Sequence, residues 1–165
     1  MDSFIDKSDE YHNVSHKRRF ARTIQILLDQ NPQGKLLELG TSELLPQCLK
    51  TLAPELEVSV TDFDLDKPIE WQKQIGDDTY QAFSLDLEKT PLPIQDSTFD
   101  YVVCSEVIEH MEIDPMFMLS EANRVLKDTG IIILTTPNVV STRGLTKMLA
   151  GIEPYFYMQY HIPGN

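Results

Sequence analysis

The sequence predicts an α/β protein built on an open, doubly wound parallel sheet, and three observations lead to that class. Apolar or β-branched segments alternate with segments of helical periodicity along the chain. Such alternation produces a mostly parallel sheet with right-handed crossovers and helices on both faces. Polar residues follow several of the strands at their carboxyl ends. Finally, 165 residues correspond to one domain. We therefore expect residues 1–165 to form a single domain, with the polar segment 1–15 flexible.

The first elements alternate between helix and strand. Residues 35–40 are apolar almost throughout, which is typical of a buried parallel strand. Proline fits only the first turn of a helix, so the next helix begins at Leu45 or Pro46 and leaves residues 41–44 as a loop. A β-branched, alternating segment predicts the second strand over 57–62. Before these elements, a helix over 16–30 is indicated by apolar residues on one face: Phe20, Ile24, Leu27 and Leu28.

Three further elements follow in the middle of the chain. Residues 66–76 predict a helix, with Pro68 early and Gly76 at its end. Residues 80–87 predict the third strand. The segment 88–98 contains two prolines among polar residues, which predicts a loop.

The last elements carry the clearest local signals. Residues 99–106 predict the fourth strand, and 131–136 the fifth. Asp114 followed by Pro115 is typical of an N-cap and a first helical residue. A short helix is expected over 141–151. The helix after Pro115 should end before Gly130 and bury one face: Met118, Ala122, Val125 and Leu126.

Composition restricts the partners. The net charge of −12 argues against a nucleic acid, since binding to phosphates depends on Lys and Arg. The cluster Lys17, Arg18 and Arg19 is interpreted as a solvated helix face. Cys48 and Cys104 show no metal-ligand spacing, so we expect reduced core thiols, no metal and a cytoplasmic protein. No apolar run reaches the roughly 20 residues of a membrane span, and residues 1–10 lack the apolar core of a signal peptide.

The segment 97–138 resembles a known family. It contains "FDYVVCSEVIEH" and "RVLKDTGIIILTTPN", which are similar to motifs of the class I S-adenosylmethionine-dependent methyltransferases, in the methyltransferase type 11-like branch. The resemblance implies a Rossmann-like sheet in the order 3-2-1-4-5 and S-adenosylmethionine as the cofactor. Ligands in such sheets bind beyond the carboxyl ends of the strands.

The resemblance also implies roles for residues at the strand ends. Asp62 would accept hydrogen bonds from the ribose hydroxyls; its alternative is an acid facing water, with Asp64 as a competitor. Asp86 would accept from the adenine amino group, or else form a turn. Glu38 would order the loop and the amino-acid moiety, or else form a buried salt bridge. The cofactor-binding residues implied are Glu38, Gly40, Thr41, Ser42, Asp62, Phe63, Asp86, Leu87, Cys104 and Ser105.

His110 has three readings. It is the candidate catalytic residue, as a general base for a substrate hydroxyl. It could instead bind a metal with Glu106, although no third ligand is placed by spacing. The third reading is a structural histidine beside Glu109. Cys104 lacks an adjacent base and is not expected to be a nucleophile.

Two departures from the family pattern are visible. The first loop retains Gly40 but has Ser42 and Leu44 at later glycine positions, which bears on cofactor affinity. Only 27 residues follow Asn138, so the last two strands of the family sheet are expected to be absent. The fifth-strand edge would then be apolar, and it or the aromatic tail could contact a second copy or another chain.

Three functions compete on this evidence. The first is methyl transfer to oxygen or nitrogen of a small molecule, for which the resemblance suggests a sugar or lipid-linked metabolite as the acceptor. The second is a catalytically silent methyltransferase-fold protein that acts as a binding module, which the altered loop and short C-terminus favour. A nicotinamide-dependent oxidoreductase is disfavoured because GxGxxG is absent.

Overall fold

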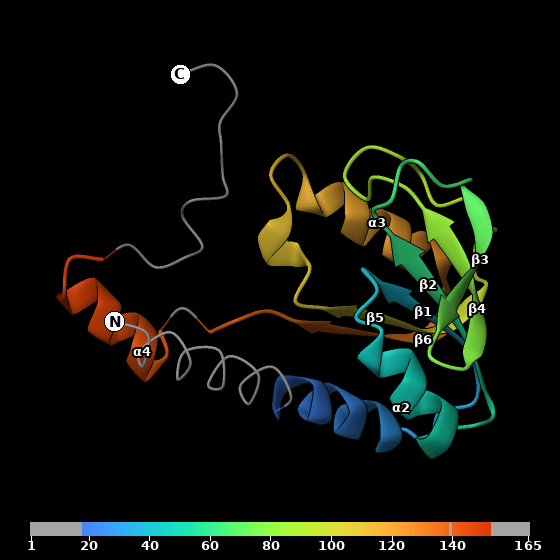
Figure 1. Cartoon of the computed structure of the whole chain (residues 1–165), viewed down its shortest axis with the longest axis horizontal. Coiled ribbons are helices and arrows are strands. Elements are labelled where there is room, and N and C mark those ends of the chain that lie inside the picture. The colour runs from blue at the N-terminus through green and yellow to red at the C-terminus, as the bar shows by residue number, and fades with distance from the viewer. Residues whose placement is uncertain (1–17, 139, 153–165) are drawn as a thin grey trace.

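The computed structural model describes residues 18–138 and 140–152, and these residues form a sheet flanked by helices (Figure 1). The six strands lie in the order β3-β4-β2-β1-β5-β6. Their bounds are Gly34–Leu39 for β1, Leu56–Asp62 for β2, Glu70–Ile75 for β3, Asp78–Ser84 for β4, Phe99–Ser105 for β5 and Leu126–Thr135 for β6. The α/β class and its doubly wound sheet are thereby confirmed.

Five of the strands are parallel and occur in the predicted order. β1 pairs with β2 on one side and with β5 on the other, while β4 and β6 extend the sheet outward. The register places Leu39 opposite Cys104 and Asp62 opposite Ser84. The parallel strands therefore end together, and the polar residues that follow them share one edge of the sheet.

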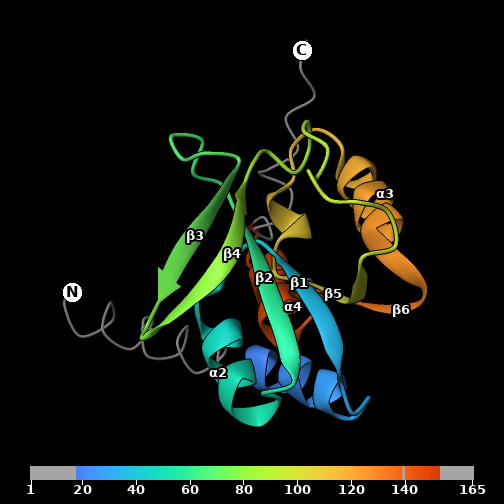
Figure 2. The same cartoon turned by 90° about the vertical axis from the view of Figure 1, so that its right-hand side faces the viewer.

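β3 corrects the sequence analysis, because the helix predicted over 66–76 is wrong. Residues Glu70–Ile75 instead form an edge strand antiparallel to β4 (Figure 2). Burial alternates along this strand and is greatest at Ile75. Gly76 has a φ of 60° and begins a two-residue turn, since Ile75 pairs directly with Asp78. A glycine at the first turn position is a hairpin signal that outweighs the helical reading.

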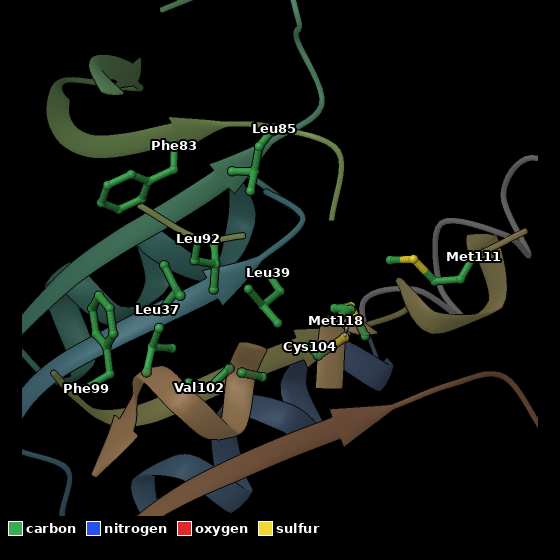
Figure 3. Close-up of a cluster of buried hydrophobic side chains, with 12 residues drawn as sticks. Leu37, Leu39, Phe83, Leu85, Leu92, Phe99, Val102, Cys104, Met111 and Met118 are labelled. Carbon is green, nitrogen blue, oxygen red and sulfur yellow. Dashed lines mark hydrogen bonds between the residues drawn. The ribbon is translucent and has the colours of Figure 1, made fainter. Parts of the chain in front are cut away.

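Helices cover both faces of the sheet. The N-terminal helix, residues 18–28, and α2, Leu44–Leu52, pack on one face. α3, Pro115–Val125, packs on the other, with Met118 and Ala122 fully buried against the strands. Figure 3 shows this second cluster, in which Leu37, Val102 and Cys104 lie close to α3. β1 therefore sends alternate side chains to opposite layers, and Glu38 shares the face of Leu36 beneath α2.

The end of α3 also differs from the expectation. Helix and strand are contiguous, because α3 ends at Val125 and β6 begins at Leu126. Residues 126–130 therefore belong to a strand rather than to the helix. β6 is the outermost strand on its side of the described sheet, and its apolar side chains Ile131, Ile132 and Leu134 are exposed. The expectation of an apolar fifth-strand edge agrees with this arrangement.

The chain after β6 contains α4, Thr142–Leu149, which lies beyond the end of that strand in Figure 1. Within the described part of the chain, no strand follows β6. The segment 1–15 and the aromatic tail from residue 153 onward lie outside the described residues. Over residues 18–138 and 140–152, no helix combines the length and apolar character that crossing a membrane requires.

Candidate cofactor site at the carboxyl edge of the sheet

The loop after β1 is bound to the end of β2. The Gly40 amide donates to Thr61 Oγ1 at 2.8 Å, and both the amide and the hydroxyl of Thr41 donate to the carbonyl oxygen of Thr61, at 3.0 and 2.5 Å. Thr61 itself is buried. Sequence reasoning selected Gly40 and Thr41 but missed Thr61, whose hydroxyl gives this loop its position. A β-branched residue inside a strand carries no signal that would reveal this function.

Gly40 occupies a conformation that other residues avoid. Its φ is 73°, and a Cβ at this position would lie 2.6 Å from Cγ2 of Val107. The chain therefore turns sharply here and passes close to the segment that follows β5. The one glycine retained in the altered loop is the one that the backbone geometry requires.

Gly40→Ala should destabilise the protein by about 2 kcal/mol, because it combines a positive φ with a steric overlap. Denaturant unfolding measures this change. Adding Val107→Ala removes the methyl group in the way, so the double variant should lose less stability than the sum of the two single variants. Simple additivity would show that the contact with Val107 is unimportant.

Ser42 performs two tasks at one of the missing glycine positions. Its hydroxyl donates to Glu38 Oε1 at 2.6 Å, and its amide donates to the same oxygen at 3.2 Å. The hydroxyl oxygen also accepts from the Leu45 amide at 3.1 Å, in the first turn of α2. Besides Gly40, the residue of this loop with a positive φ is Glu43, at 57°, and not Ser42. Serine is thus compatible with the fold here, and its hydroxyl serves Glu38.

Glu38 is a fully buried carboxyl group. Burial raises its pKa to about 7, against the opposing effects of the Ser42 hydrogen bonds and the nearby charge of Lys73. Its second oxygen, Oε2, is buried and has no hydrogen-bond partner among the described residues. A buried acceptor without a donor costs free energy, so this oxygen is suited to a ligand that supplies one.

Asp62 lies at the tip of β2 in an ion pair that the sequence did not indicate. Its Oδ2 is 2.6 Å from Nζ of Lys73, and its Oδ1 accepts from the Phe63 amide at 2.9 Å. The two charged side chains are 25% and 15% exposed, so the pair is partly shielded from water. Lys73 was missed because its segment was read as a helix. Phe63 exposes most of its side chain.

Asp86 follows β4 at the same edge. Its Oδ2 is 2.7 Å from Nζ of Lys89, and its Oδ1 accepts from the Glu88 amide at 3.0 Å. Burial raises the pKa of Asp86, but the hydrogen bonds from Lys89 and Glu88 and the charge of Lys89 together hold this pKa below its ordinary value. Leu87 packs against the α3-side core. Asp86 is therefore ionised at neutral pH and also forms the turn that was its alternative reading.

Cys104 and Ser105, the last two residues of β5, differ in the surroundings of their side chains. The Cys104 side chain is buried against α3, 4.0 Å from Sδ of Met118, so only its backbone can face the edge of the sheet. Burial, with a smaller effect of Glu109, raises the pKa of this thiol to about 12. A buried thiol with a raised pKa is poorly suited to nucleophilic attack. Ser105 Oγ lies 3.0 Å from Oγ1 of Thr135 on β6.

Glu106 forms an ion pair that sequence reasoning also missed. Its Oε2 accepts from Nη1 of Arg19, which connects the end of β5 to the N-terminal helix. Oε1 of Glu106 is buried and has no hydrogen-bond partner in the part of the chain that is described. Glu106 has a φ of 60°, an unusual conformation for a non-glycine residue. The interpretation of Arg19 as part of a solvated helix face is therefore corrected. Its guanidinium group pairs with Glu106 at the carboxyl edge of the sheet.

His110 ends the short 3-10 helix Ile108–His110 and is exposed. Its amide donates to the Val107 carbonyl oxygen at 2.9 Å. Across the described residues, no group of three or more His, Cys, Asp or Glu side chains is arranged to hold a metal ion. The metal reading for His110 and Glu106 therefore has no geometric support in this region.

The strand tips share one arrangement. Glu38, Asp62 and Asp86 lie at or just after the ends of β1, β2 and β4, beside the tight loop that contains Gly40. A family model described as a methyltransferase domain matches residues 39–134, more than half of the chain. The chain belongs to this family, and with it to the class I S-adenosylmethionine-dependent methyltransferases. No curated protein matches the sequence.

Several solved structures share the fold. A S-adenosylmethionine-dependent methyltransferase from Archaeoglobus fulgidus is 17% identical with a TM-score of 0.59, over 85% of this chain and 64% of that one. The PH0226 protein from Pyrococcus horikoshii is 24% identical with a TM-score of 0.55, over 81% and 58%.

A third similar structure is phosphoethanolamine N-methyltransferase 2 from Haemonchus contortus, in complex with S-adenosylmethionine. It is 17% identical with a TM-score of 0.52, over 78% of this chain and 32% of that chain. The chain thus spans less than two thirds of the length of each of these structures.

Proposed function

We propose that the protein binds S-adenosylmethionine at the carboxyl edge of its sheet and transfers the methyl group to oxygen or nitrogen of a small molecule. The observation that carries this proposal is the buried Glu38 carboxylate beside the Gly40 loop. Its Oε2 lacks a donor among the described residues, and the cofactor's ammonium group is a donor. The residues present therefore fit the group.

The other strand tips have complementary chemistry. Each carboxylate oxygen can accept two hydrogen bonds, so Asp62 retains capacity for the ribose hydroxyls beside its bonds to Lys73 and Phe63. Asp86 is an ionised acceptor suited to the adenine amino group. The adjoining backbone of Leu87 would meet the ring edge. Gly40, Thr41, Ser42, Phe63, Cys104 and Ser105 complete the proposed site through backbone and loop contacts.

Methyl transfer asks the protein mainly for alignment. The bound cofactor supplies an activated methyl group on a sulfonium centre. The tightly anchored Gly40 loop and the strand tips would fix its position, and such positioning accounts for much of the acceleration in reactions of this kind. His110 is the candidate general base that would take the proton from an acceptor hydroxyl. An amine acceptor that binds in its neutral form would not require this step before attack.

The acceptor is proposed on chemical grounds. A net charge of −12 disfavours nucleic acids. The family resemblance suggests a small molecule instead, such as a sugar or a lipid-linked metabolite. The reduced form of both cysteines, Cys48 and Cys104, supports a cytoplasmic location within this proposal.

Calorimetric titration with S-adenosylmethionine and S-adenosylhomocysteine tests the cofactor site. Asp62→Ala should weaken binding by about 50-fold, because it removes an acceptor of charge-assisted hydrogen bonds. Asp64→Ala is the comparison variant, since Asp64 is the competing acid near the tip of β2 and its carboxylate accepts a local bond from the Asp66 amide. Absence of binding at millimolar ligand would contradict the proposal, as would equal effects of the two substitutions.

A catalytically silent binding module is the second candidate. The Lys73–Asp62 ion pair favours it, because it occupies part of the proposed ribose acceptor. The exposed apolar residues of β6 favour it too, since they offer an edge to a second copy or a partner chain. Cofactor binding without transfer of labelled methyl to a panel of alcohols and amines would support this function.

A further inference from the structure

We infer that Lys73 is a specificity-determining residue that, together with Asp62, binds the ribose hydroxyls of the cofactor. This inference rests on the proposed function and assigns a second residue to the same site. It arises from β3, the antiparallel strand whose hairpin with β4 brings a lysine to the carboxyl edge.

The position of the Lys73 ammonium group is the first argument. Nζ lies 2.6 Å from Oδ2 of Asp62, and the side chain is only 15% exposed. The charge also reaches Glu38, whose pKa it lowers against the larger effect of burial. The ammonium group therefore lies at the tip of β2, near enough to the end of β1 for its charge to act on Glu38.

The hydrogen-bonding capacity of the pair is the second argument. An ammonium group has three donors, and one of them binds Asp62. Asp62 has acceptor capacity left at both oxygens, since each accepts a single hydrogen bond from the described residues. A ribose hydroxyl both donates and accepts, so it can donate to Asp62 while accepting from Lys73. A carboxylate alone would offer only the first of these bonds.

Lys73 differs in this respect from Lys50, a lysine on α2. Lys50 also pairs with an aspartate of β4, Asp78, but at 3.2 Å and with a side chain that is 61% exposed. Exposed pairs of that kind contribute little. The shielding of the Lys73 pair makes its hydrogen bonds to a ligand stronger, because they compete less with water.

The experiment measures whether the protein distinguishes a ribose from a deoxyribose. The probes are S-adenosylhomocysteine and its 2′-deoxy and 3′-deoxy analogues, titrated calorimetrically into the full chain. Lys73→Met should weaken the binding of S-adenosylhomocysteine by about tenfold and the binding of at least one deoxy analogue by less. The ratio of these affinities, which measures discrimination, should therefore fall. Lys73→Arg, which keeps the charge and the donors, should restore part of the discrimination that Lys73→Met loses. Lys50→Met is the matched control and should change neither quantity.

Three results would overturn the inference. Lys73→Met could weaken all three ligands equally, which would indicate a structural role. It could leave binding unchanged, or it could tighten binding, which would show that Lys73 competes with the ribose. In each case Asp62→Ala would still lose affinity if the proposed function holds. If the unaltered protein binds none of the ligands, the proposed function fails as well. Lys73→Gln provides a second neutral variant if Lys73→Met does not fold.

Discussion

Replacing Glu38 with glutamine should make the protein more stable than the unaltered chain at pH 8 and leave it similarly stable at pH 4.5. Burial raises the pKa of Glu38 from 4.5 to about 7. Between these values the folded protein holds a proton that the unfolded chain has lost. Raising the pH therefore favours unfolding, and the stabilising contribution, complete below about pH 4.5, is lost as the pH rises through about 7.

The size of the Glu38 effect follows from the shift. Each pKa unit corresponds to about 1.4 kcal/mol, so the full loss is about 3 kcal/mol. Glutamine keeps an oxygen for the Ser42 hydroxyl and amide but has no charge to bury. Denaturant unfolding of both proteins from pH 4.5 to 8 gives the difference between their free energies of unfolding directly. The other titrating groups are the same in both proteins, so their contributions cancel. A difference that stays constant across this range would show that Glu38 is ionised throughout.

A bound ligand should oppose the loss of stability that ionised Glu38 causes. An ammonium group beside Glu38 Oε2 would favour the carboxylate and lower its pKa, because opposite charges stabilise one another. Binding of S-adenosylmethionine near pH 7 should therefore release a proton from the unaltered protein and not from Glu38→Gln. Titrations in two buffers of different ionisation enthalpy would measure that proton.

Arg124→Ala should destabilise the protein by about 3 kcal/mol, because it leaves a shielded carboxylate without its partner. Arg124 binds both oxygens of Glu121, at 2.7 and 2.9 Å. Its guanidinium also donates to the carbonyl oxygens of Leu92 and Ile94. The Leu92 amide in turn donates to Glu121 at 2.8 Å. One side chain thus holds the long loop after β4 against α3.

Arg22→Ala is the matched control for Arg124→Ala, since Arg22 is an exposed residue of the N-terminal helix. Its loss should change the free energy of unfolding by less than about 0.5 kcal/mol. Thermal and denaturant unfolding measure both variants. The loop held by Arg124 begins next to Asp86, so cofactor affinity should fall as well. Equal stability of the two variants would show that the loop is held by its apolar residues alone.

Much of the fold could be predicted because its signals are local. The buried strand over 35–40 is almost wholly apolar, and Asp114 with Pro115 starts α3 as expected, with Asp114 Oδ1 accepting from the Met116 amide. The parallel order of the five predicted strands followed from the family resemblance and the handedness of crossovers. Asp62 and Asp86 could be placed at one edge for the same reason.

Other features depended on contacts between distant residues. The segment 66–76 has a proline early and a glycine late, as a helix would, but pairing with β4 made it a strand. Arg19 and Glu106 are 87 positions apart and meet only because the N-terminal helix packs across β5. No sequence motif links Arg19 to Glu106, so composition and periodicity cannot reveal the pair.

The sequence by itself determined the alternation of strands and helices, the acids at the strand tips and the family, because these reside in short segments and fixed spacings. Only the tertiary structure decided that Asp62 faces Lys73, that Ser42 supports Glu38, and that Glu38 titrates near neutral pH. Those properties arise from burial and from the distance between side chains of different strands, and both exist only once the sheet has formed.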